Sequence, residues 1–283
     1  MKIKNECLPC IYRQTLEACQ MITGDKQQIR EILKEVALMI SEVGEETAPR
    51  VTERIQQLIK DKVGVDDPYL DFKEDNLRQS LVLYDKIKQS IEAHEQPLTG
   101  ALIMAATGNA IDAGVTLDID VDKIVDKALE QGFARDNLPD FQKLLKPNSR
   151  VMIIGDNTGE AVFDKLLIEE LHNYNVEVTY AVRECPILND VTLREAREIG
   201  LDQVSRVISS GSRAPGMVLA EATEEFMEYF KSADIVISKG QGNLEGLSGE
   251  VERPIFFLLK AKCGVIADLL GVNEGELVFV LKN

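Results

Sequence analysis

The chain has 283 residues, of which 45% are hydrophobic and 28% are charged, and its formal net charge is −16. This balance is ordinary for a globular protein with one large or two modest domains, and the negative charge argues against nucleic acid or an anionic membrane as the main partner. The first ten residues contain no apolar signal segment, no apolar stretch is long enough to span a bilayer, and the five cysteines are scattered. We therefore expect a cytoplasmic protein.

The first 145 residues have the apolar spacing of helices, and no strand-like alternation stands out in them. The spacing predicts helices over residues 8–22, 29–43, 49–59, 77–91, 97–111, 121–129 and 138–145. We expect residues 1–145 to form an all-α lobe.

The pattern changes after Pro147, where short apolar runs alternate with helical stretches. Such alternation is typical of parallel strands joined by right-handed crossovers. We expect residues 146–283 to form an α/β domain with a Rossmann-like, doubly wound, mainly parallel sheet. The expected strands are 151–155, 176–182, 204–208, 234–238, 263–267 and 277–281, and the expected helices are 160–172, 192–199, 216–231 and 254–262.

Oxygen-bearing side chains follow two of the predicted strands. Asp156 and Asn157 end the first strand, and Asp190 lies in the segment after the second. The carboxyl ends of parallel strands meet at one edge of the sheet, so we expect these side chains to converge. Carboxylate and carboxamide oxygens suit a hard divalent cation. Taken singly, Asp156 could instead cap the next helix, and Asp190 could belong to a turn.

Groups that can bind phosphate follow the same strands. Arg183 comes after the second strand, Ser210 after the third and Lys239 after the fourth, where Gly240 and Asn243 continue the segment. Positive charge, small hydroxyls and glycine turns with exposed N–H groups suit a phosphate held beside a metal ion. The simpler alternatives are a serine-rich loop and a flexible glycine loop.

Three segments, taken in order, resemble the signature of the damage-control phosphatases, also called domain of unknown function 89. They are Gly155-Asp-Asn-Thr-Gly-Glu160, Arg183-Glu-Cys-Pro-Ile-Leu-Asn189-Asp190 and Ser238-Lys-Gly-Gln-Gly-Asn243. Cys7-Leu-Pro-Cys10 and Gly108-Asn-Ala-Ile-Asp112 resemble the prokaryotic subgroup that carries a CxxC motif. The resemblance implies a helical lobe beside a Rossmann-like sheet. It also implies a divalent-metal-dependent phosphatase of small phosphorylated metabolites, including sugar phosphates and damaged cofactor precursors.

The resemblance also assigns roles to individual positions. Asp156, Asn157 and Asp190 would hold a divalent ion (Mg, Mn, Co or Ni), and Asp156 would take part in catalysis. Lys239 would contact the phosphate, and Glu160 would lie close to the metal and the attacking water. We count both among the catalytic residues with Asp156.

The remaining substrate-binding positions surround this centre. The resemblance places Gly240 and Asn243 beside the phosphate-contacting lysine, and it brings Asn109 and Asp112 to the pocket from the helical lobe. Arg183 and Ser210 follow strands, as described above, and we include them in the substrate-binding set.

Two nucleophiles are compatible with such a site, a water molecule or a carboxylate that attacks phosphorus. A nucleophilic aspartate followed two residues later by a second aspartate would favour the carboxylate. Here Asn157 and Thr158 follow Asp156, which favours water.

Two other classes of protein compete with a phosphatase. One is a nucleotide- or S-adenosylmethionine-binding module without phosphatase activity, and the other is a scaffold whose helical lobe binds partners. The first requires a glycine-rich turn after the first strand and an acidic residue after the second strand. This chain has Asp156 and Asn157 in that turn and Arg183 after the second strand. The second leaves the polar strand ends unexplained.

Cys7 and Cys10 form a CxxC pair with three open interpretations: packed thiols, half of a second metal site, or a redox pair. No strand precedes them, so a thioredoxin-like context is absent. The two histidines, His94 and His172, are expected at the surface, which argues against zinc or serine-triad chemistry. The oligomeric state stays open.

Overall fold

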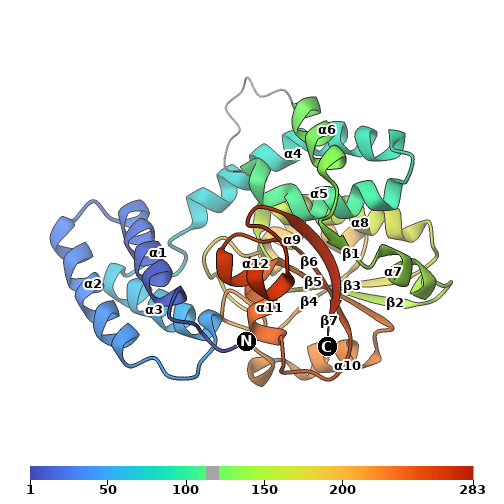
Figure 1. The fold of residues 1–283 in the computed structure, drawn as a ribbon. Coiled ribbons are helices and arrows are strands. Elements are labelled where there is room, and N and C mark those ends of the chain that lie inside the picture. Colours follow the sequence, from blue (N-terminus) through green and yellow to red (C-terminus); the bar gives the residue numbers. More distant parts are fainter. Residues whose placement is uncertain (113–120, 283) are drawn as a thin grey trace.

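The computed structural model describes residues 1–112 and 121–282, apart from the side chains of residues 109–112, 121, 122 and 124. These residues form twelve α-helices and one seven-stranded sheet (Figure 1). Within this part of the chain, none of the helices combines the length and the apolarity needed to cross a bilayer.

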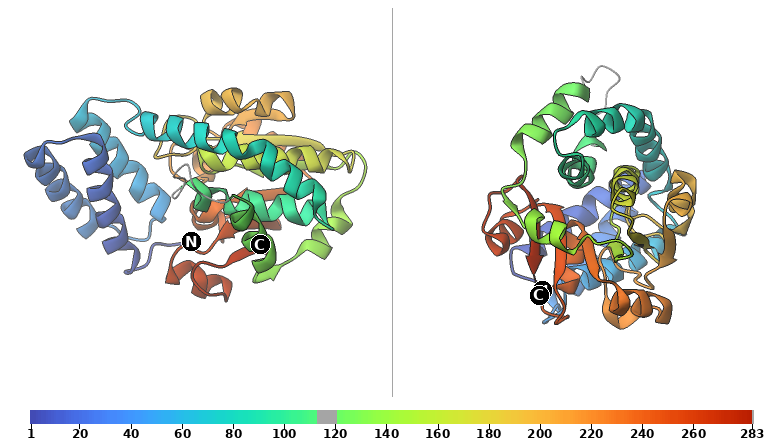
Figure 2. Two further views of the ribbon diagram at one scale, coloured as in Figure 1. Left: turned by 90° about the horizontal axis from the view of Figure 1, so that it is seen from above. Right: turned by 90° about the vertical axis from the view of Figure 1, so that its right-hand side faces the viewer.

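Three helices at the N-terminal end form a separate bundle: α1 (Cys7–Ile22), α2 (Lys26–Ser41) and α3 (Ala48–Val63). Figure 1 and the left view of Figure 2 show this bundle to one side of the sheet. It has its own hydrophobic cluster, whose fully buried members include Cys19, Ile32 and Val51. The bundle therefore does not depend on the sheet for its core.

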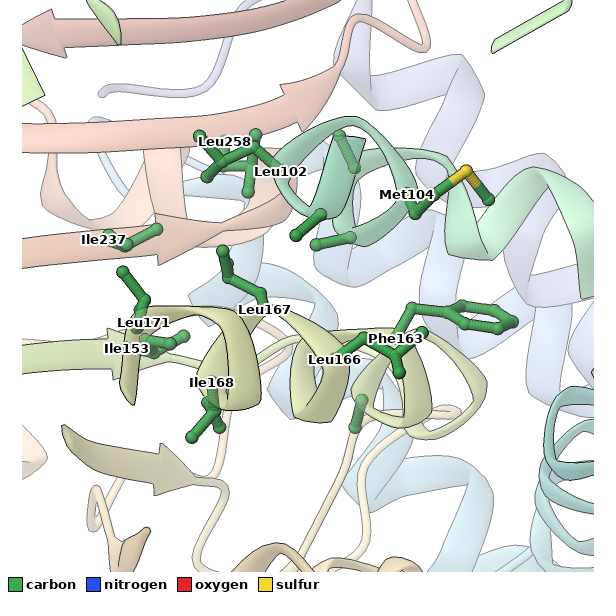
Figure 3. Packing of buried hydrophobic residues seen from close by; sticks show 14 of the residues in the cluster. Leu102, Met104, Ile153, Phe163, Leu166, Leu167, Ile168, Leu171, Ile237 and Leu258 are labelled. Carbon is green, nitrogen blue, oxygen red and sulfur yellow. The ribbon is translucent and has the colours of Figure 1, made fainter. Parts of the chain in front are cut away.

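The next four helices contribute to the hydrophobic cluster on one face of the sheet. They are α4 (Leu70–Ala93), α5 (Pro97–Asp112), α6 (Val121–Gln131) and α7 (Leu138–Leu144). Helix α5 packs against both α4 and α8 (Thr158–His172) and also contacts the sheet, so its apolar residues are buried on more than one side. Leu102 of α5 lies beside Leu258 of the sheet, and Leu167 of α8 lies near Ile237 (Figure 3).

The sheet has the strand order β1-β7-β6-β5-β2-β3-β4. Its strands are β1 (Arg135–Asp136), β2 (Arg150–Ile154), β3 (Glu177–Val182), β4 (Arg206–Ser209), β5 (Ile235–Lys239), β6 (Ile255–Lys260) and β7 (Leu277–Lys282). Adjacent strands are parallel except for β6 and β7. The expected α/β class with a mainly parallel sheet and a helical N-terminal part is confirmed.

Residues of one strand alternate between two cores, one on each face of the sheet. Ile153 and Ile237 belong to the cluster that also contains residues of α4, α5 and α8, whereas Met152 and Val236 belong to the cluster on the opposite face. That face is covered by α10 (Glu224–Ser232), α11 (Gly240–Leu247) and α12 (Gly264–Leu270), while α9 (Leu193–Ile199) joins the first face. Because both faces are covered, the strands are apolar throughout.

The prediction for residues 254–267 was wrong. We expected a helix over 254–262 and a strand over 263–267, but the order is β6 and then α12. All five residues from Ile255 to Leu259 are buried. A strand buried on both faces has no alternation, and periodicity cannot distinguish it from a buried helix.

Smaller differences have local causes. The helix expected over 216–231 begins only at Glu224, because the side chain of Thr223 caps it by accepting a hydrogen bond from the N–H of Phe226 at 3.0 Å. The two-residue strand β1 lies in the part expected to be all-helical, and it pairs with β7. It is too short to leave a sequence pattern. The division into a lobe of residues 1–145 and a domain of residues 146–283 stays a prediction.

Candidate metal and phosphate site

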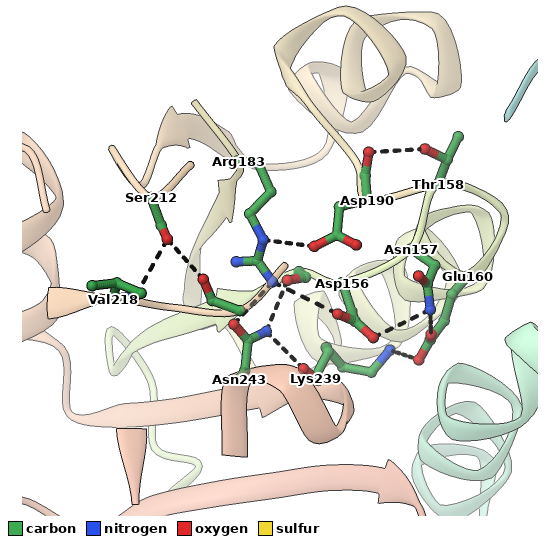
Figure 4. A network of polar contacts seen from close by, with 12 residues as sticks. Asp156, Asn157, Thr158, Glu160, Arg183, Asp190, Ser212, Val218, Lys239 and Asn243 are labelled. Atoms are coloured by element: carbon green, nitrogen blue, oxygen red, sulfur yellow. Dashed lines mark hydrogen bonds and ion pairs between the residues drawn. The ribbon is translucent and has the colours of Figure 1, made fainter. Parts of the chain in front are cut away.

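The turn between β2 and α8 places Asp156 and Asn157 at the carboxyl edge of the sheet. Asn157 occupies the N-cap position of α8, but its side chain does not cap the helix. Its Nδ2 instead donates to Asp156 Oδ2 at 3.2 Å and to Glu160 Oε2 at 3.3 Å. The N-cap position thus belongs to Asn157 and not to Asp156, for which capping was the alternative, and the Asn157 side chain faces its acidic neighbours (Figure 4).

The segment after β3 folds back onto this turn. The N–H of Val191 donates to the carbonyl of Asp156 at 2.8 Å, and the N–H of Thr158 donates to the carbonyl of Asn189 at 2.8 Å. These bonds bring Asp190 beside Asn157. Asp156 and Asp190 are thus neighbours at one edge of the sheet, as the sequence predicts.

Arg183 joins the two carboxylates. Its Nε donates to Asp190 Oδ2 at 2.7 Å, and its Nη2 lies 3.6 Å from Asp156 Oδ1. The same Nη2 donates to Asn243 Oδ1 at 3.0 Å, and Asn243 donates to the carbonyls of Gly155 and Lys239. Arg183 is only 1% exposed, and its Nη1 has no hydrogen-bond partner among the described residues. Arg183 and Asn243 therefore link the segments that follow β2, β3 and β5.

Lys239 lies at the end of β5 and is fully buried. Its ammonium group donates to Glu160 Oε1 at 2.6 Å, to Asp164 Oδ1 at 2.6 Å and to the carbonyl of Ala105 at 2.9 Å. Asp164 also accepts a hydrogen bond from the hydroxyl of Tyr180 at 2.7 Å. All three ammonium protons therefore have acceptors, so in this arrangement Lys239 has no free donor for a ligand.

The titration of these groups reflects burial and mutual repulsion. Burial, and then the charges of Asp190 and Glu160, raise the pKa of Asp156 to about 8. Burial also raises the pKa of Asp190, against the opposing effect of Arg183. Burial raises the pKa of Asp164 to about 6, although Lys239 opposes the shift. The site thus concentrates more negative charge than its own cations neutralise.

Asp164 and Lys239 form a buried ion pair within this network. Burial alone would lower the pKa of Lys239, but the charges of Asp164 and Glu160 outweigh it and raise this pKa above its usual value. The lysine therefore stays positively charged in the interior. Sequence reasoning missed Asp164, although it lies one helical turn after Glu160 on the same face of α8.

Gly240 follows Lys239 and begins α11. Its φ is +74°, and a Cβ atom at this position would lie 2.0 Å from Asp156 Oδ2. A glycine is therefore required for the backbone angle and for the space that the carboxylate occupies.

Two cavities meet at this edge. The larger, of about 740 Å³, is bordered by α1 and α3, by the segment that carries Asp190, and by α11 and α12. The smaller, of about 320 Å³, is bordered by Glu160, Gly240, Lys260 and Glu274, among others. Three residues line both cavities: Asp156, Gln241 and Lys262.

Other predicted site residues have different positions. Ser210 is buried, its hydroxyl oxygen accepts from the N–H of Ser212, and it lines neither cavity. The side chains of Asn109 and Asp112 lie outside the described residues. Cys7 and Cys10 both line the larger cavity, so the CxxC pair lies at the rim of the site.

The donor set fits a hard cation. Asp156 and Asp190 supply carboxylate oxygens, and Asn157 supplies a carboxamide next to them. In the described parts of the chain, no three carboxylate, imidazole or thiol side chains converge as a ready-made ion site. An ion held here would therefore take oxygen from Asn157 and from solvent or substrate as well.

The fold and the site define a class: an α/β protein with buried carboxylates, a carboxamide and paired cations at the carboxyl edge of a parallel sheet. Comparison with known proteins identifies the family. Residues 3–278 match the damage-control phosphatase ARMT1-like domain, so the chain belongs to that family. The resemblance inferred from the three sequence segments is confirmed.

Relatives of similar length are known from three archaea. The chain is 35% identical to a damage-control phosphatase of Pyrococcus horikoshii, over 98% of this chain and 97% of the relative. It is 28% identical to a damage-control phosphatase of Archaeoglobus fulgidus, over 98% of each chain. It is 33% identical to an uncharacterized protein of Methanocaldococcus jannaschii, over 99% of this chain and 95% of the relative.

The fold also matches a solved structure. A crystal structure of a DUF89 family protein from Pyrococcus horikoshii superposes with a TM-score of 0.92 at 33% identity, covering 100% of both chains. The arrangement of helices and sheet described above is therefore the fold of this family.

Proposed function

We propose that this protein is a divalent-metal-dependent phosphatase that hydrolyses phosphate monoesters of small metabolites. The names of its relatives support a phosphatase role. One structural observation supports the proposal most directly: Asp156, Asn157 and Asp190 come together where the two cavities meet. Sugar phosphates and damaged cofactor precursors are the proposed substrate classes, and the cytoplasm is the proposed location.

The charges around the site favour a divalent cation. Four carboxylates are buried here, on Asp156, Glu160, Asp164 and Asp190, and the buried side chains of Arg183 and Lys239 balance only part of their charge. Asp156, Asn157 and Asp190 would hold the ion, for which Mg, Mn, Co and Ni are the candidates. When bound, the ion supplies Lewis acidity and charge neutralisation for a phosphoryl group.

Glu160 is proposed to act on the attacking water. It lines the smaller cavity, and its two carboxylate oxygens are held by Asn157 and Lys239. A carboxylate fixed in this way can accept a proton from a water molecule that attacks phosphorus. The proposed nucleophile is therefore water, and the appearance of solvent oxygen-18 in an enzyme carboxylate after a single turnover would contradict it.

We propose that Lys239 and Arg183 supply buried positive charge next to the carboxylates of the site. Both are buried and paired, so they position Glu160 and the two aspartates. Direct contact between Lys239 and a phosphate stays a prediction, and it would require the ammonium group to leave Ala105, Glu160 or Asp164.

The test is hydrolysis of an aryl phosphate with Mg, Mn, Co or Ni, each with and without a chelator, together with the metal content of the purified protein. We expect phosphate release that depends on the metal. No release and no retained metal would contradict the proposal, and tight binding of a nucleotide without hydrolysis would favour the binding module.

A further inference from the structure

One lysine of α4 is buried between two carboxylates, away from the site itself. Lys73 is only 1% exposed, and its ammonium group lies 2.6 Å from Asp67 Oδ2 and 2.7 Å from Glu195 Oε1. It lines neither of the two cavities at the edge of the sheet. A buried ammonium group with two carboxylate partners restricts their arrangement, because separating the charges in the interior is costly. The positions of these partners indicate what Lys73 holds in place.

The two carboxylates belong to different parts of the fold. Asp67 lies in the turn between α3 and α4, where its Oδ1 accepts a hydrogen bond from the N–H of Tyr69 at 3.2 Å. Glu195 lies in the first turn of α9 and is buried. Lys73 thus connects the turn that leaves the N-terminal bundle to the helix that follows Asp190.

The second oxygen of Glu195 extends this connection toward the site. Glu195 Oε2 accepts a hydrogen bond from the N–H of Thr192 at 3.0 Å and another from the hydroxyl of Thr192. These contacts belong to the capping box at the start of α9. Burial would raise the pKa of Glu195, but the hydrogen bonds from Lys73 and Thr192 outweigh burial and lower this pKa below its usual value. Glu195 therefore stays ionised and holds both partners.

Thr192 is joined in turn to the backbone of the site. It lies two residues after Asp190, and it pairs with Arg183 in a parallel β-bridge. Between Asp190 and Thr192, the N–H of Val191 donates to the carbonyl of Asp156 at 2.8 Å, and the carbonyl of Val191 accepts from Arg183 at 3.0 Å. A displacement of Thr192 would therefore disturb the contacts that bring Asp156 and Asp190 together.

We propose that Lys73 is a positioning residue of the metal site, because through Glu195 and Thr192 it fixes the backbone that presents Asp190 to the ion. This inference rests on the proposed metal-dependent function. Arg183 also holds the Asp190 carboxylate directly, at 2.7 Å. Loss of Lys73 should therefore loosen this ligand without removing it.

The first comparison is between Lys73→Met and the control Lys88→Met. Lys88 lies on the same helix and forms an ion pair of 2.7 Å with Glu169, near the other end of α8 from the site. Both variants lose one lysine charge of α4, but only Lys73 is connected to Thr192. A general effect of charge on the protein would appear in both.

A second comparison avoids leaving uncompensated carboxylates in the interior. Thr192→Val removes the hydroxyl that donates to Glu195, and Thr192→Ser keeps it. Both variants retain the ion pair between Lys73 and Glu195. This pair of variants tests the last step of the connection if Lys73→Met does not fold.

The measurements are calorimetric titration with Mn²⁺ alone, hydrogen exchange at the N–H of Val191, and denaturant unfolding. We expect Lys73→Met and Thr192→Val to weaken Mn²⁺ binding by about tenfold, the lower end of the range for groups that orient metal ligands. Exchange at Val191 should become faster in the same two variants. Lys88→Met and Thr192→Ser should match the wild type in both measurements. A residue that only stabilises the fold would change the unfolding curve and leave the Mn²⁺ affinity of the folded protein unchanged.

Unchanged Mn²⁺ affinity in a folded Lys73→Met protein would overturn the inference, and so would an equal loss in Lys88→Met. If Lys73→Met does not fold, equal affinities of Thr192→Val and Thr192→Ser would overturn it. If the wild type binds no metal and hydrolyses no phosphate ester, the proposed function fails. Hydrogen exchange then still tests Lys73 by itself, since unchanged exchange at Val191 in Lys73→Met would contradict its positioning role.

Discussion

The carboxylate of Asp156 lies in the space that a side chain at position 240 would need. A Cβ atom on residue 240 would lie 2.0 Å from Asp156 Oδ2, which is too close for two non-bonded atoms. The residue after β2 and the residue after β5 are therefore in close contact. The position of the predicted metal ligand depends on the absence of a side chain on the neighbouring strand end.

Gly240→Ala should displace Asp156 and reduce metal-dependent activity by at least about tenfold, because misplacing a group at the reacting centre is costly. It should also cost about 1–2 kcal/mol of stability from the left-handed backbone. Gly249→Ala is the matched control, since Gly249 has a φ of +80° and nothing within 4 Å of its Cβ position. Activity assays and denaturant unfolding of both variants separate the two effects. Equal activity in both would contradict the steric argument.

Asp156→Ala and Asp190→Ala should each abolish turnover, with a loss of at least about 100-fold, because each removes a ligand or charge at the reacting centre. The fold should survive, as circular dichroism can show. Asp234→Ala is the control, since Asp234 pairs with Arg150 at the other end of the strands, 3.7 Å away. Full turnover in either site variant would mean that the site lies elsewhere.

Lys239→Met should destabilise the protein by about 3–5 kcal/mol, because it leaves buried carboxylates on Glu160 and Asp164 without their cation. The double variant Lys239→Met with Asp164→Asn should recover part of this loss. Denaturant unfolding of the two variants provides the comparison. A Lys239→Met protein of wild-type stability would favour direct phosphate contact over the positioning role.

Stability should depend on pH through Asp164. Its pKa is raised from 3.8 to about 6 in the folded protein, so the folded state binds this proton more tightly than the unfolded state. The resulting contribution is fully present below pH 3.8 and is lost as the pH rises through about 6. In the metal-free protein, the free energy of unfolding should fall between pH 4 and 7 by on the order of 2–3 kcal/mol relative to Asp164→Asn. Parallel curves for the two proteins would contradict this assignment.

Chelation should remove activity reversibly, and the metal should raise the melting temperature of the wild type. Ligands that bind only the folded state stabilise it in proportion to the logarithm of their excess over Kd. The same metal should leave the melting temperature of Asp156→Ala nearly unchanged. A comparable rise in both proteins would place the ion at another position.

The sequence predicted the helices of the N-terminal part and five of the strands of the sheet well, because their apolar spacing is strong and their ends carry turn residues. It failed at β6 and α12 because Ile255 and its neighbours are buried on both faces, so no alternation distinguishes strand from helix.

The grouping of Asp156, Asn157 and Asp190 could be predicted from strand ends alone, because parallel topology brings those ends to one edge. The partners of Lys239 could not be predicted. Its contact with the carbonyl of Ala105 joins residues 134 positions apart, and no local pattern encodes such a distance. The place of Asp164 in the site could have been predicted from its spacing to Glu160. The place of Lys262 at the border of both cavities could not, because the predicted order of β6 and α12 was wrong.

The separate hydrophobic cluster of α1, α2 and α3 has a consequence for how this protein can diversify. One wall of the larger cavity belongs to that bundle, while the groups proposed to react are anchored in the two cores of the sheet. The bundle also contacts the segment that carries Asp190, because Leu188 packs against the cluster and Lys60 of α3 donates to the carbonyl of Pro186. A substitution in the bundle would therefore change the wall of the larger cavity and, through this segment, the position of a proposed metal ligand.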